Sequence, residues 1–335
     1  MKPYLSIVAT SRNDNHGKDL LKRMEYFISG VIQQSNRYKI PVELIIVEWN
    51  PPKDKKNLPE VLHIGDTGEY CIVRNIEVSE ELHLSFRRRE HNLPLYQMIA
   101  KNVGIRRAKG EFVLATNIDL LFSNELFEWF SKKELRPDML YRANRYDIDN
   151  NLPENGTIDE WLEFAKNHIV RENTFHGSRM VESWRYASIH NDDTVPGQKI
   201  PNGGIAVYGN ASGDFQLLHK SIWEKTRGYV EWDEFSFHMD SIFEYAGVLS
   251  TQKEVILPDE FCAYHIEHGE GYKFDDTESM NNKVKKESTG RILGAELRVW
   301  GELMARERRA FVFNRENWGL SQYELPETVF TGSNS

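Results

Sequence analysis

The first half of the chain alternates short, almost continuously apolar runs with segments of helical periodicity. The apolar runs are typical of β-strands buried on both faces, and the periodic segments are typical of helices packed along one side. This alternation predicts a parallel sheet covered by helices on both faces, a fold that binds ligands at the carboxyl ends of its strands. The predicted strands are residues 5–10, 42–47, 71–78 and 112–116, and the predicted helices include residues 20–31 and 95–107.

The second half of the sequence has a different pattern. Residues 147–213 are rich in Asn, Asp, Gly and Pro, which predicts a long irregular segment with short strands and one helix near residues 161–168. Long segments of this kind often carry binding loops or lids. Beyond it we expect helices at residues 221–226 and 240–246, strands at 255–257 and 261–265, and an amphipathic helix at 293–304.

The composition is that of an ordinary globular protein. The 335 residues are 40% hydrophobic and include 51 acidic and 42 basic side chains, a net charge of −9. These values exclude extensive disorder and argue against a protein whose main role is to coat nucleic acid. Cys71 and Cys262 lie in apolar runs, so we expect two buried thiols and no disulfide framework. No stretch approaches the ~20 apolar residues of a membrane-spanning helix and no signal-peptide pattern opens the sequence, so we expect a cytoplasmic location.

Asp119 follows the fourth predicted strand, in the sequence Thr-Asn-Ile-Asp at residues 116–119. The preceding block, residues 100–114, reads Ala-Lys-Asn-Val-Gly-Ile-Arg-Arg-Ala-Lys-Gly-Glu-Phe-Val-Leu. It resembles the family 2 glycosyltransferases with the GT-A fold, which carry an Arg/Lys-Asn-x-Gly-Ile-x-x-Ala-x-Gly-Glu block followed by a strand and an Asp-x-Asp motif. The resemblance extends over most of the first 250 residues.

The resemblance implies an α/β fold of the GT-A type. It would have a mostly parallel, Rossmann-like central sheet flanked by helices, a smaller mixed region on the acceptor side and a C-terminal helix. We expect a single domain, with a nucleotide-sugar-binding half at residues 1–125, an acceptor and catalytic half at 126–275 and a C-terminal helical extension at 276–335.

The donor residues implied by the resemblance come from the loop after the first strand, the end of the second strand, and residues 101–119. Residues 7–13 are similar to the family's first strand and nucleotide loop. Glu48 ends the second strand, where an acidic side chain usually meets the base; it could accept the ring N–H of a uracil, or it could be a solvated strand-end residue. The residues assigned to the nucleotide sugar are Thr10, Ser11, Arg12, Glu48, Lys101, Asn102, Asn117 and Asp119.

The metal site implied by the resemblance centres on Asp119, the last residue of the Asp-x-Asp position. Asn117 replaces the first Asp, and its amide could bind the ribose. A late histidine usually completes such a site. We expect His265 to do so, with His268 as the alternative, because strand alternation would place the two on opposite faces. The metal would be Mn²⁺ or Mg²⁺, neutralising charge on the leaving diphosphate.

The acceptor side resembles the family less closely. Residues 213–218 and 228–231 match its acceptor segment, which makes Asp214 and Glu231 candidates for binding acceptor hydroxyls, with Asp233 as a lesser one. Asp240 matches the aspartate that serves as base in inverting members, although His238 and Met239 replace the usual preceding Glu. The alternative is that Asp240 only caps a helix and takes no part in catalysis.

These features lead to one main hypothesis and two alternatives. We expect a metal-dependent, inverting glycosyltransferase (hexosyltransferase-like) that moves a sugar from a nucleotide-sugar donor, UDP-linked, to a carbohydrate or other hydroxyl acceptor. A nucleotidyltransferase lacks support because no Gly-rich loop follows the first strand. A degenerate scaffold that binds sugars or partners without catalysis is the other alternative. We expect residues 192–210 to become ordered when the donor binds. The sequence predicts no oligomeric state.

Overall fold

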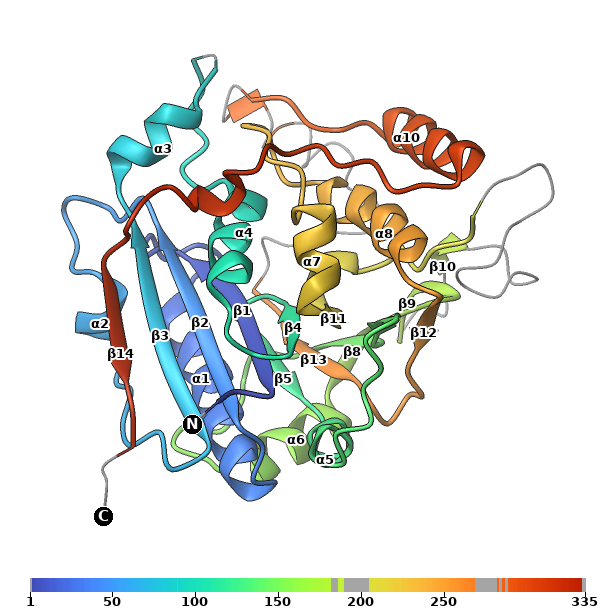
Figure 1. Ribbon diagram of the computed structural model, residues 1–335. Helices are drawn as coiled ribbons and strands as arrows, with labels where there is room; N and C mark the ends of the chain where they lie inside the picture. The colour runs from blue at the N-terminus through green and yellow to red at the C-terminus, as the bar shows by residue number, and fades with distance from the viewer. Residues whose placement is uncertain are drawn as a thin grey trace.

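A computed structural model describes residues 2–88, 90–181, 186–189, 205–268, 282, 285–286 and 289–332. The fold is built around a twisted eight-stranded sheet (Figure 1). In spatial order its strands are β12 (Lys253–Ile256), β6 (Met139–Arg142), β11 (Gln216–His219), β4 (Phe112–Ala115), β1 (Leu5–Ser11), β2 (Val42–Trp49), β3 (Cys71–Val78) and β14 (Glu327–Phe330).

The centre of this sheet is parallel. β1 pairs with β2 and β4, and β2 pairs with β3, all in parallel register, while β11 runs antiparallel between β4 and β6. All seven residues of β1 and all eight of β2 are buried, as expected for strands covered on both faces. The predicted α/β class, a mostly parallel sheet flanked by helices, is confirmed.

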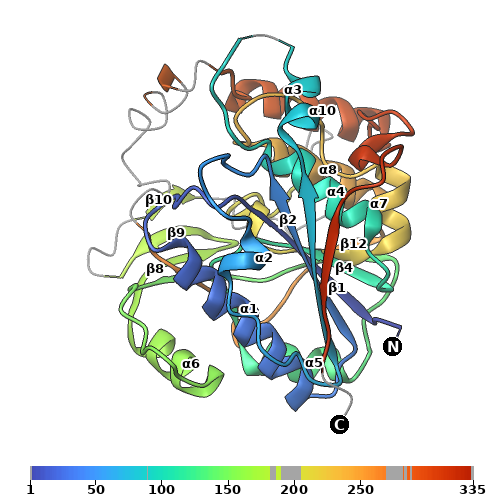
Figure 2. The same cartoon turned by 90° about the vertical axis from the view of Figure 1, so that its left-hand side faces the viewer.

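Helices cover both faces of the sheet, as the edge-on view in Figure 2 shows. On one face, α1 (Leu20–Arg37) packs Met24 and Phe27 against β1 and β2. The other face carries α4 (Gln97–Arg107), α7 (Lys220–Thr226), α8 (Met239–Ser250) and α10 (Gly294–Glu307). Short helices α2 (Leu58–Val61) and α3 (Glu80–Phe86) lie on the connections around β3.

Gly104 explains part of the block that resembles the glycosyltransferases. A Cβ atom at this position of α4 would lie 2.5 Å from a methyl carbon of Val8 on β1. Only glycine therefore allows α4 to approach the sheet this closely. The middle of β1 and the carboxyl-terminal half of α4 are held close together as a result.

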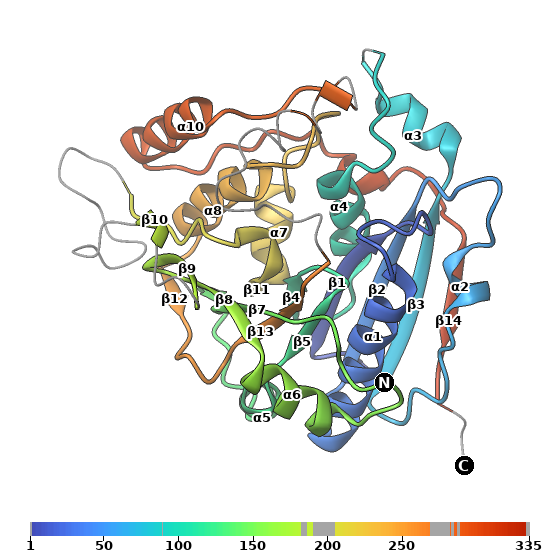
Figure 3. The same cartoon turned by 180° about the vertical axis from the view of Figure 1, so that it is seen from behind.

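A second, six-stranded sheet packs beside the first, seen from behind in Figure 3. Its order is β10 (Tyr186–Ile189), β9 (Gly177–Met180), β8 (Ile169–Thr174), β7 (Arg145–Ile148), β13 (Ala263–Ile266) and β5 (Leu120–Phe122), with α5 (Asn124–Ser131) and α6 (Ile158–Asn167) at its lower end. The short strands and the single helix expected in residues 147–213 are present, as β8, β9, β10 and α6. Most of residues 192–210, expected to order with the donor, lie outside the described residues.

The chain passes between the two sheets at residues 116–119. β4 belongs to the first sheet and β5, four residues later, belongs to the second. The connecting residues are Thr116, Asn117, Ile118 and Asp119. Asp119 therefore lies where two sheets meet, and Ile266 of β13 fixes it there by donating its backbone N–H to the Asp119 carbonyl at 2.9 Å.

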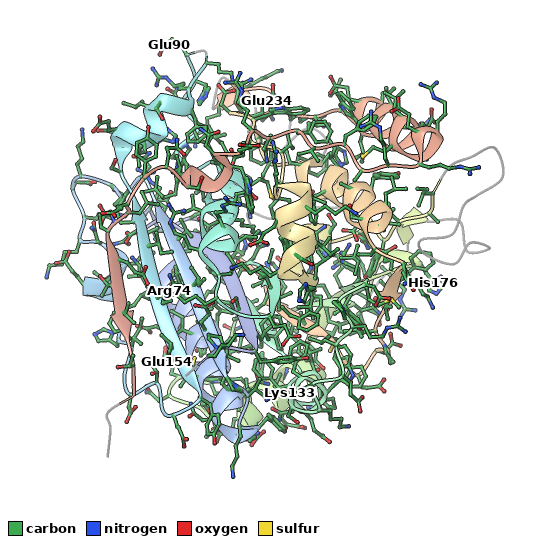
Figure 4. All side chains as sticks on the ribbon, viewed as in Figure 1. Arg74, Glu90, Lys133, Glu154, His176 and Glu234 are labelled. Carbon is green, nitrogen blue, oxygen red and sulfur yellow. The ribbon has the colours of Figure 1, made fainter. Side chains whose placement is uncertain are left out.

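The C-terminal segment returns to the first half of the chain. β14 pairs antiparallel with β3, and Arg74 of β3 donates from Nε to Glu327 of β14 at 2.5 Å and from Nη1 to the buried Glu43 at 2.7 Å. Figure 4 labels Arg74 beside β14. We expected a helical extension after residue 275; α10 is present, but the segment ends as an edge strand, which the sequence analysis did not predict.

Candidate functional site

A cavity of about 350 Å³ opens at the carboxyl ends of β1 and β4, the position expected for a ligand site in a parallel sheet. Part of its wall is apolar and includes residues 93–95 and Phe235, and another part is densely charged. The cavity is lined by Thr10, Ser11, Arg12, Asp14, His16, Leu20, Arg23, Leu93, Pro94, Leu95, Gln97, Asn117, Ile118, Asp119, Arg145, Arg171, Asp214, Phe235, Ser236, His265 and His268.

Three side chains with metal-binding atoms converge on the charged wall. Asp119, His265 and His268 each offer one ligand atom, and these atoms lie within 4.8 Å of one another. Nε2 of His265 is 3.7 Å from Oδ2 of Asp119, and Nε2 of His268 is 3.4 Å from the same oxygen. The convergence comes from residues far apart in the sequence, brought together at the junction of the two sheets.

Both histidines face Asp119, so the expectation that they would lie on opposite faces is wrong. Alternation of side chains holds only while a strand continues. β13 ends at Ile266, and the chain no longer follows the strand when it reaches His268. His265 approaches Asp119 from inside the strand, and His268 approaches it from just beyond the strand's end.

Burial and charge set the protonation of this cluster. Burial disfavours the charged form of Asp119, but the adjacent imidazoles outweigh it and hold the pKa of this carboxyl well below its usual range. Burial likewise disfavours the charge on His265, yet the carboxylates of Asp119 and Asp147 raise its pKa to about 10. The carboxylate is therefore ionised and ready to bind a cation, whereas His265 must lose a proton to become a ligand.

The three residues fit a divalent cation. One carboxylate and two imidazoles are a ligand set that Mn²⁺ accepts. Nε2 of each ring faces Asp119, and Nδ1 of His268 is buried without a hydrogen-bond partner among the described residues, which is unusual for a structural histidine. The structure thus supports cation binding on chemical grounds that are independent of the resemblance.

A second set, Asp147, His265 and Glu267, also has ligand atoms within 4.8 Å. Its carboxylates are already paired. Arg171 donates from Nε to Asp147 and from Nη2 to Glu267 at 2.8 Å, and Nε of Arg145 lies 2.8 Å from Asp147. Asp147 and Glu267 do not line the cavity, whereas Asp119, His265 and His268 all do, so we assign cation binding to the set that contains Asp119.

Asn117 and Asp214 form a hydrogen-bonded pair on the cavity wall. Nδ2 of Asn117 donates to Oδ1 of Asp214 at 2.5 Å, and Oδ1 of Asn117 accepts from Gln97 at 3.0 Å. The other oxygen of Asp214 accepts from Arg145 at 2.6 Å. The amide that replaces the family's first Asp is therefore positioned by a donor on one side and a carboxylate on the other.

The predicted donor loop lies on the cavity wall. Thr10, Ser11 and Arg12 all line the cavity at the end of β1. Thr10 donates to the carbonyl of Val47 at 2.8 Å, and Arg12 donates from Nε to the carbonyl of Asn50 at 2.6 Å. These bonds join the ends of β1 and β2 and fix the loop that leaves β1.

Besides Asp233 and Asp240, four predicted residues do not line this cavity. Glu48 accepts the backbone N–H of Leu58 with both oxygens, at 2.9 and 3.0 Å, and so caps α2. Burial raises the pKa of Glu48 to about 7, against the opposing effect of that hydrogen bond. Lys101 is fully buried and donates to the carbonyl of Gly213 at 2.8 Å, and burial lowers its pKa to about 8.

The remaining two members of this group anchor the C-terminal segment. Asn102 donates to the carbonyl of Tyr229 and accepts its N–H, both at 2.8 Å. Glu231 accepts from Asn102 at 3.1 Å and from the backbone N–H of Gly319 at 2.8 Å. These contacts are those of structural residues, and they place Glu231 away from the cavity-lining set.

Asp240 lies next to the cavity wall without being part of it. It occupies the first turn of α8, where Oδ1 accepts the backbone N–H of Ser241 at 2.8 Å. A Cβ atom on Gly213 would lie 2.8 Å from Oδ2 of Asp240, so this glycine leaves space for the carboxylate beside Asp214. Asp240 is half-buried and near the acceptor-side residue predicted to bind a hydroxyl.

The sequence analysis did not single out Arg23, Arg145, Asp147 or Arg171. Two signals were present. Arg23 lies three residues after Leu20 and four before Phe27, which puts a charged side chain on the buried face of a helix. Arg145 and Asp147 alternate along a strand and so share a face. Charged residues at positions where the pattern requires apolar ones indicate a site.

Comparisons with known proteins give a distant structural likeness. No family model matches the sequence, and no curated protein matches it. Among solved structures, S. aureus TarS 1-349 aligns with a TM-score of 0.46 and 13% identity over 92% of this chain and 72% of that one. Its complex with UDP aligns with a TM-score of 0.44 and 14% identity over 89% of this chain and 68% of that one. Its complex with UDP-GlcNAc aligns with a TM-score of 0.42 and 12% identity over 89% of this chain and 69% of that one. Identities this low carry no argument about activity.

Two further predictions can be compared with the structure. Cys71 and Cys262 are both free and buried, as expected. Among the described residues, no helix combines the length and the apolar character needed to cross a lipid bilayer.

Proposed function

We propose that this chain is a glycosyltransferase that takes a sugar from a nucleotide-diphosphate donor, UDP-linked, and transfers it to a hydroxyl acceptor. The observation that carries the proposal is the convergence of Asp119, His265 and His268 on a cavity at the carboxyl ends of β1 and β4. A diphosphate leaving group requires a cationic site of this kind beside a pocket large enough for a nucleotide.

The donor is proposed to lie along the loop that follows β1. Residues 10–12 end this strand and line the cavity, and Arg12 adds a positive charge at its edge. The apolar wall of residues 93–95 and Phe235 offers a surface on which a planar base can pack. The uracil contact predicted for Glu48 stays a prediction, although in this structure Glu48 is fully buried and bonded to Leu58.

Asp119, His265 and His268 are proposed to hold Mn²⁺ or Mg²⁺. Bound there, a divalent cation supplies Lewis-acid stabilisation of the departing diphosphate. The protein's own residues fix the geometry: Ile266 holds the Asp119 backbone, and the strand β13 carries His265 to it. Of the two metals, the imidazole ligands favour Mn²⁺.

Asp240 is proposed as the base that accepts the proton of the attacking hydroxyl. It is half-buried, and its Oδ2 is directed at Gly213, next to the cavity residue Asp214. A base on the acceptor side implies a single displacement and inversion at the anomeric carbon. Asp214 is less suited, because it is paired with Arg145 at 2.6 Å.

The proposal is tested by nucleotide binding and turnover. We expect UDP to raise the melting temperature in the presence of Mn²⁺ and to raise it much less with EDTA. UDP-, GDP- and dTDP-sugars compared at equal concentration identify the nucleotide, and release of UDP from the best donor reports turnover. Binding without any donor hydrolysis or transfer would favour the non-catalytic scaffold, and the absence of nucleotide binding would contradict the proposal.

A further inference from the structure

Arg23, in the first turn of α1, places its guanidinium group directly against Asp119. Nη1 donates to Oδ2 of Asp119 at 2.7 Å, and only 4% and 9% of the two side chains are exposed. The oxygen is the one that both imidazoles approach. Arg23 thus occupies the same carboxylate that the proposed cation would use.

The guanidinium group is fixed in this position by the loop between β1 and α1. Nη2 donates to the carbonyl of His16 at 2.5 Å and to that of Lys18 at 3.2 Å, and Nε donates to the Lys18 carbonyl at 3.4 Å. All three nitrogen atoms are therefore engaged. A side chain held by this many bonds does not move away from Asp119 without loss of several of them.

A fixed positive charge at this place opposes the binding of a bare cation. The single charge of Asp119 is already balanced by Arg23, and a divalent ion bound by Asp119 and the histidines would lie beside the guanidinium group. In a buried site, solvent and salt screen this repulsion weakly. A diphosphate that enters together with the metal brings the negative charge that offsets it.

We propose that Arg23 makes metal binding conditional on the diphosphate. Its guanidinium group weakens binding of the metal alone. With the metal bound, the site carries a net positive charge that a nucleoside diphosphate offsets, so the metal and the nucleotide bind together. The inference rests on the proposed function, since it assumes that the cavity binds both. Because binding free energies are reciprocal, the same residue makes the nucleotide depend on the metal.

The experiment measures the dissociation constant of Mn²⁺ by titration calorimetry or by its free-ion EPR signal, with and without saturating UDP. For the wild-type protein we expect much tighter Mn²⁺ binding with UDP than without it. In Arg23→Gln and Arg23→Met, which remove the charge, Mn²⁺ alone should bind about tenfold tighter, and the enhancement by UDP should shrink by at least the same factor. Arg23→Lys, which keeps the charge, should retain most of the enhancement.

Arg37→Gln is the matched control. Arg37 is on the same helix and also pairs with an aspartate, Asp159, at 2.6 Å, but it is at the surface and away from the cavity. Arg37→Gln should change neither the dissociation constant of Mn²⁺ alone nor the one measured with saturating UDP. A purely structural role for Arg23 predicts that both neutral variants lose Mn²⁺ and UDP affinity together, and that result would overturn the inference, as would unchanged Mn²⁺ affinity. If the wild-type protein binds neither Mn²⁺ nor UDP, the proposed function itself fails.

Discussion

Oδ1 of Asp147 lies 3.3 Å from Nδ1 of His265, while Nε2 of the same ring points to Asp119. The imidazole therefore lies between two buried carboxylates. The two atoms are close enough to interact, although neither completes a hydrogen bond among the described residues. A carboxylate behind a histidine ligand is the usual means of fixing the tautomer and the orientation of a metal-binding ring.

Asp147→Asn should weaken metal affinity while leaving the three proposed ligands in place. The amide is a weaker acceptor for the Nδ1 proton, so we expect a loss of about 10- to 100-fold in Mn²⁺ affinity, measured with UDP present. Asp214→Asn is the control, because it also removes a carboxylate from Arg145 but does not contact His265. Equal losses in the two variants would show that the effect comes from Arg145 and not from the histidine.

Asp119→Asn should abolish the Mn²⁺-dependent stabilisation by UDP. An amide keeps the volume of the side chain, which matters because Arg23 and both histidines pack against it. The readout is the difference in melting temperature with UDP between Mn²⁺ and EDTA. Circular dichroism of the free variant checks that the fold is retained, and an unchanged metal-dependent shift would remove Asp119 from the site.

Asp240→Asn should keep the donor bound and slow transfer. The amide cannot accept a proton at neutral pH, and loss of general-base assistance costs about 10²- to 10⁴-fold in rate. Glu231→Gln is the comparison, since Glu231 holds the backbone of Gly319 and should not affect the chemical step. The anomeric configuration of the product, by NMR, gives an independent check, and retention would leave Asp240 without this role.

The elements that could be predicted from the sequence are those whose pattern is set by local burial. β3 matches the expected residues 71–78, and α1 and α4 follow the three- and four-residue spacing of their apolar residues. β14 could not be predicted in this way, because Glu327–Phe330 is an exposed edge strand whose pairing is set by the distant Arg74.

The site was predictable in part for the same reason. Asp119 follows a buried strand and was identifiable from that position together with the preceding block. His268 was misplaced because strand alternation was applied beyond the end of the strand, whereas β13 ends at Ile266. Arg23 was missed although the sequence shows that it lies on the buried face of α1. The spacing of apolar residues identifies that face, but it does not show which residue a charged side chain on it pairs with. Partners are set by tertiary structure.

Glu48 should make stability depend on pH near neutrality. Burial raises its pKa in the folded protein to about 7, above the ordinary value of 4.5 for the unfolded chain. The folded state therefore binds more protons than the unfolded state between these values, so the stability contribution is full below pH 4.5 and is lost as the pH rises through 7. The side chain of the Glu48→Gln variant does not titrate. The free energy of unfolding of this variant, relative to the wild-type protein, should therefore be about 1–3 kcal/mol higher at pH 8 than at pH 4.5. Denaturant unfolding at both pH values measures this, and a difference independent of pH would contradict it.

Asn117 and Asp214 should behave as a coupled pair, which would account for the departure from the Asp-x-Asp pattern. Asn117 donates to Asp214 at 2.5 Å, so Asn117→Asp places two carboxylates in direct contact in a partly buried wall. We expect this variant to lose about 1–3 kcal/mol of stability near pH 7.5 and to recover part of it at pH 5, as one carboxyl takes up a proton.

The double variant Asn117→Asp, Asp214→Asn restores one amide and one carboxylate and should regain most of the loss. Recovery should be incomplete, because Arg145 then faces a neutral amide at position 214 and keeps its ion pair only with Asp147 among the described residues. A double-mutant cycle from denaturant unfolding gives the coupling free energy, and additive effects of the two substitutions would show that the hydrogen bond does not determine which residue occupies position 117.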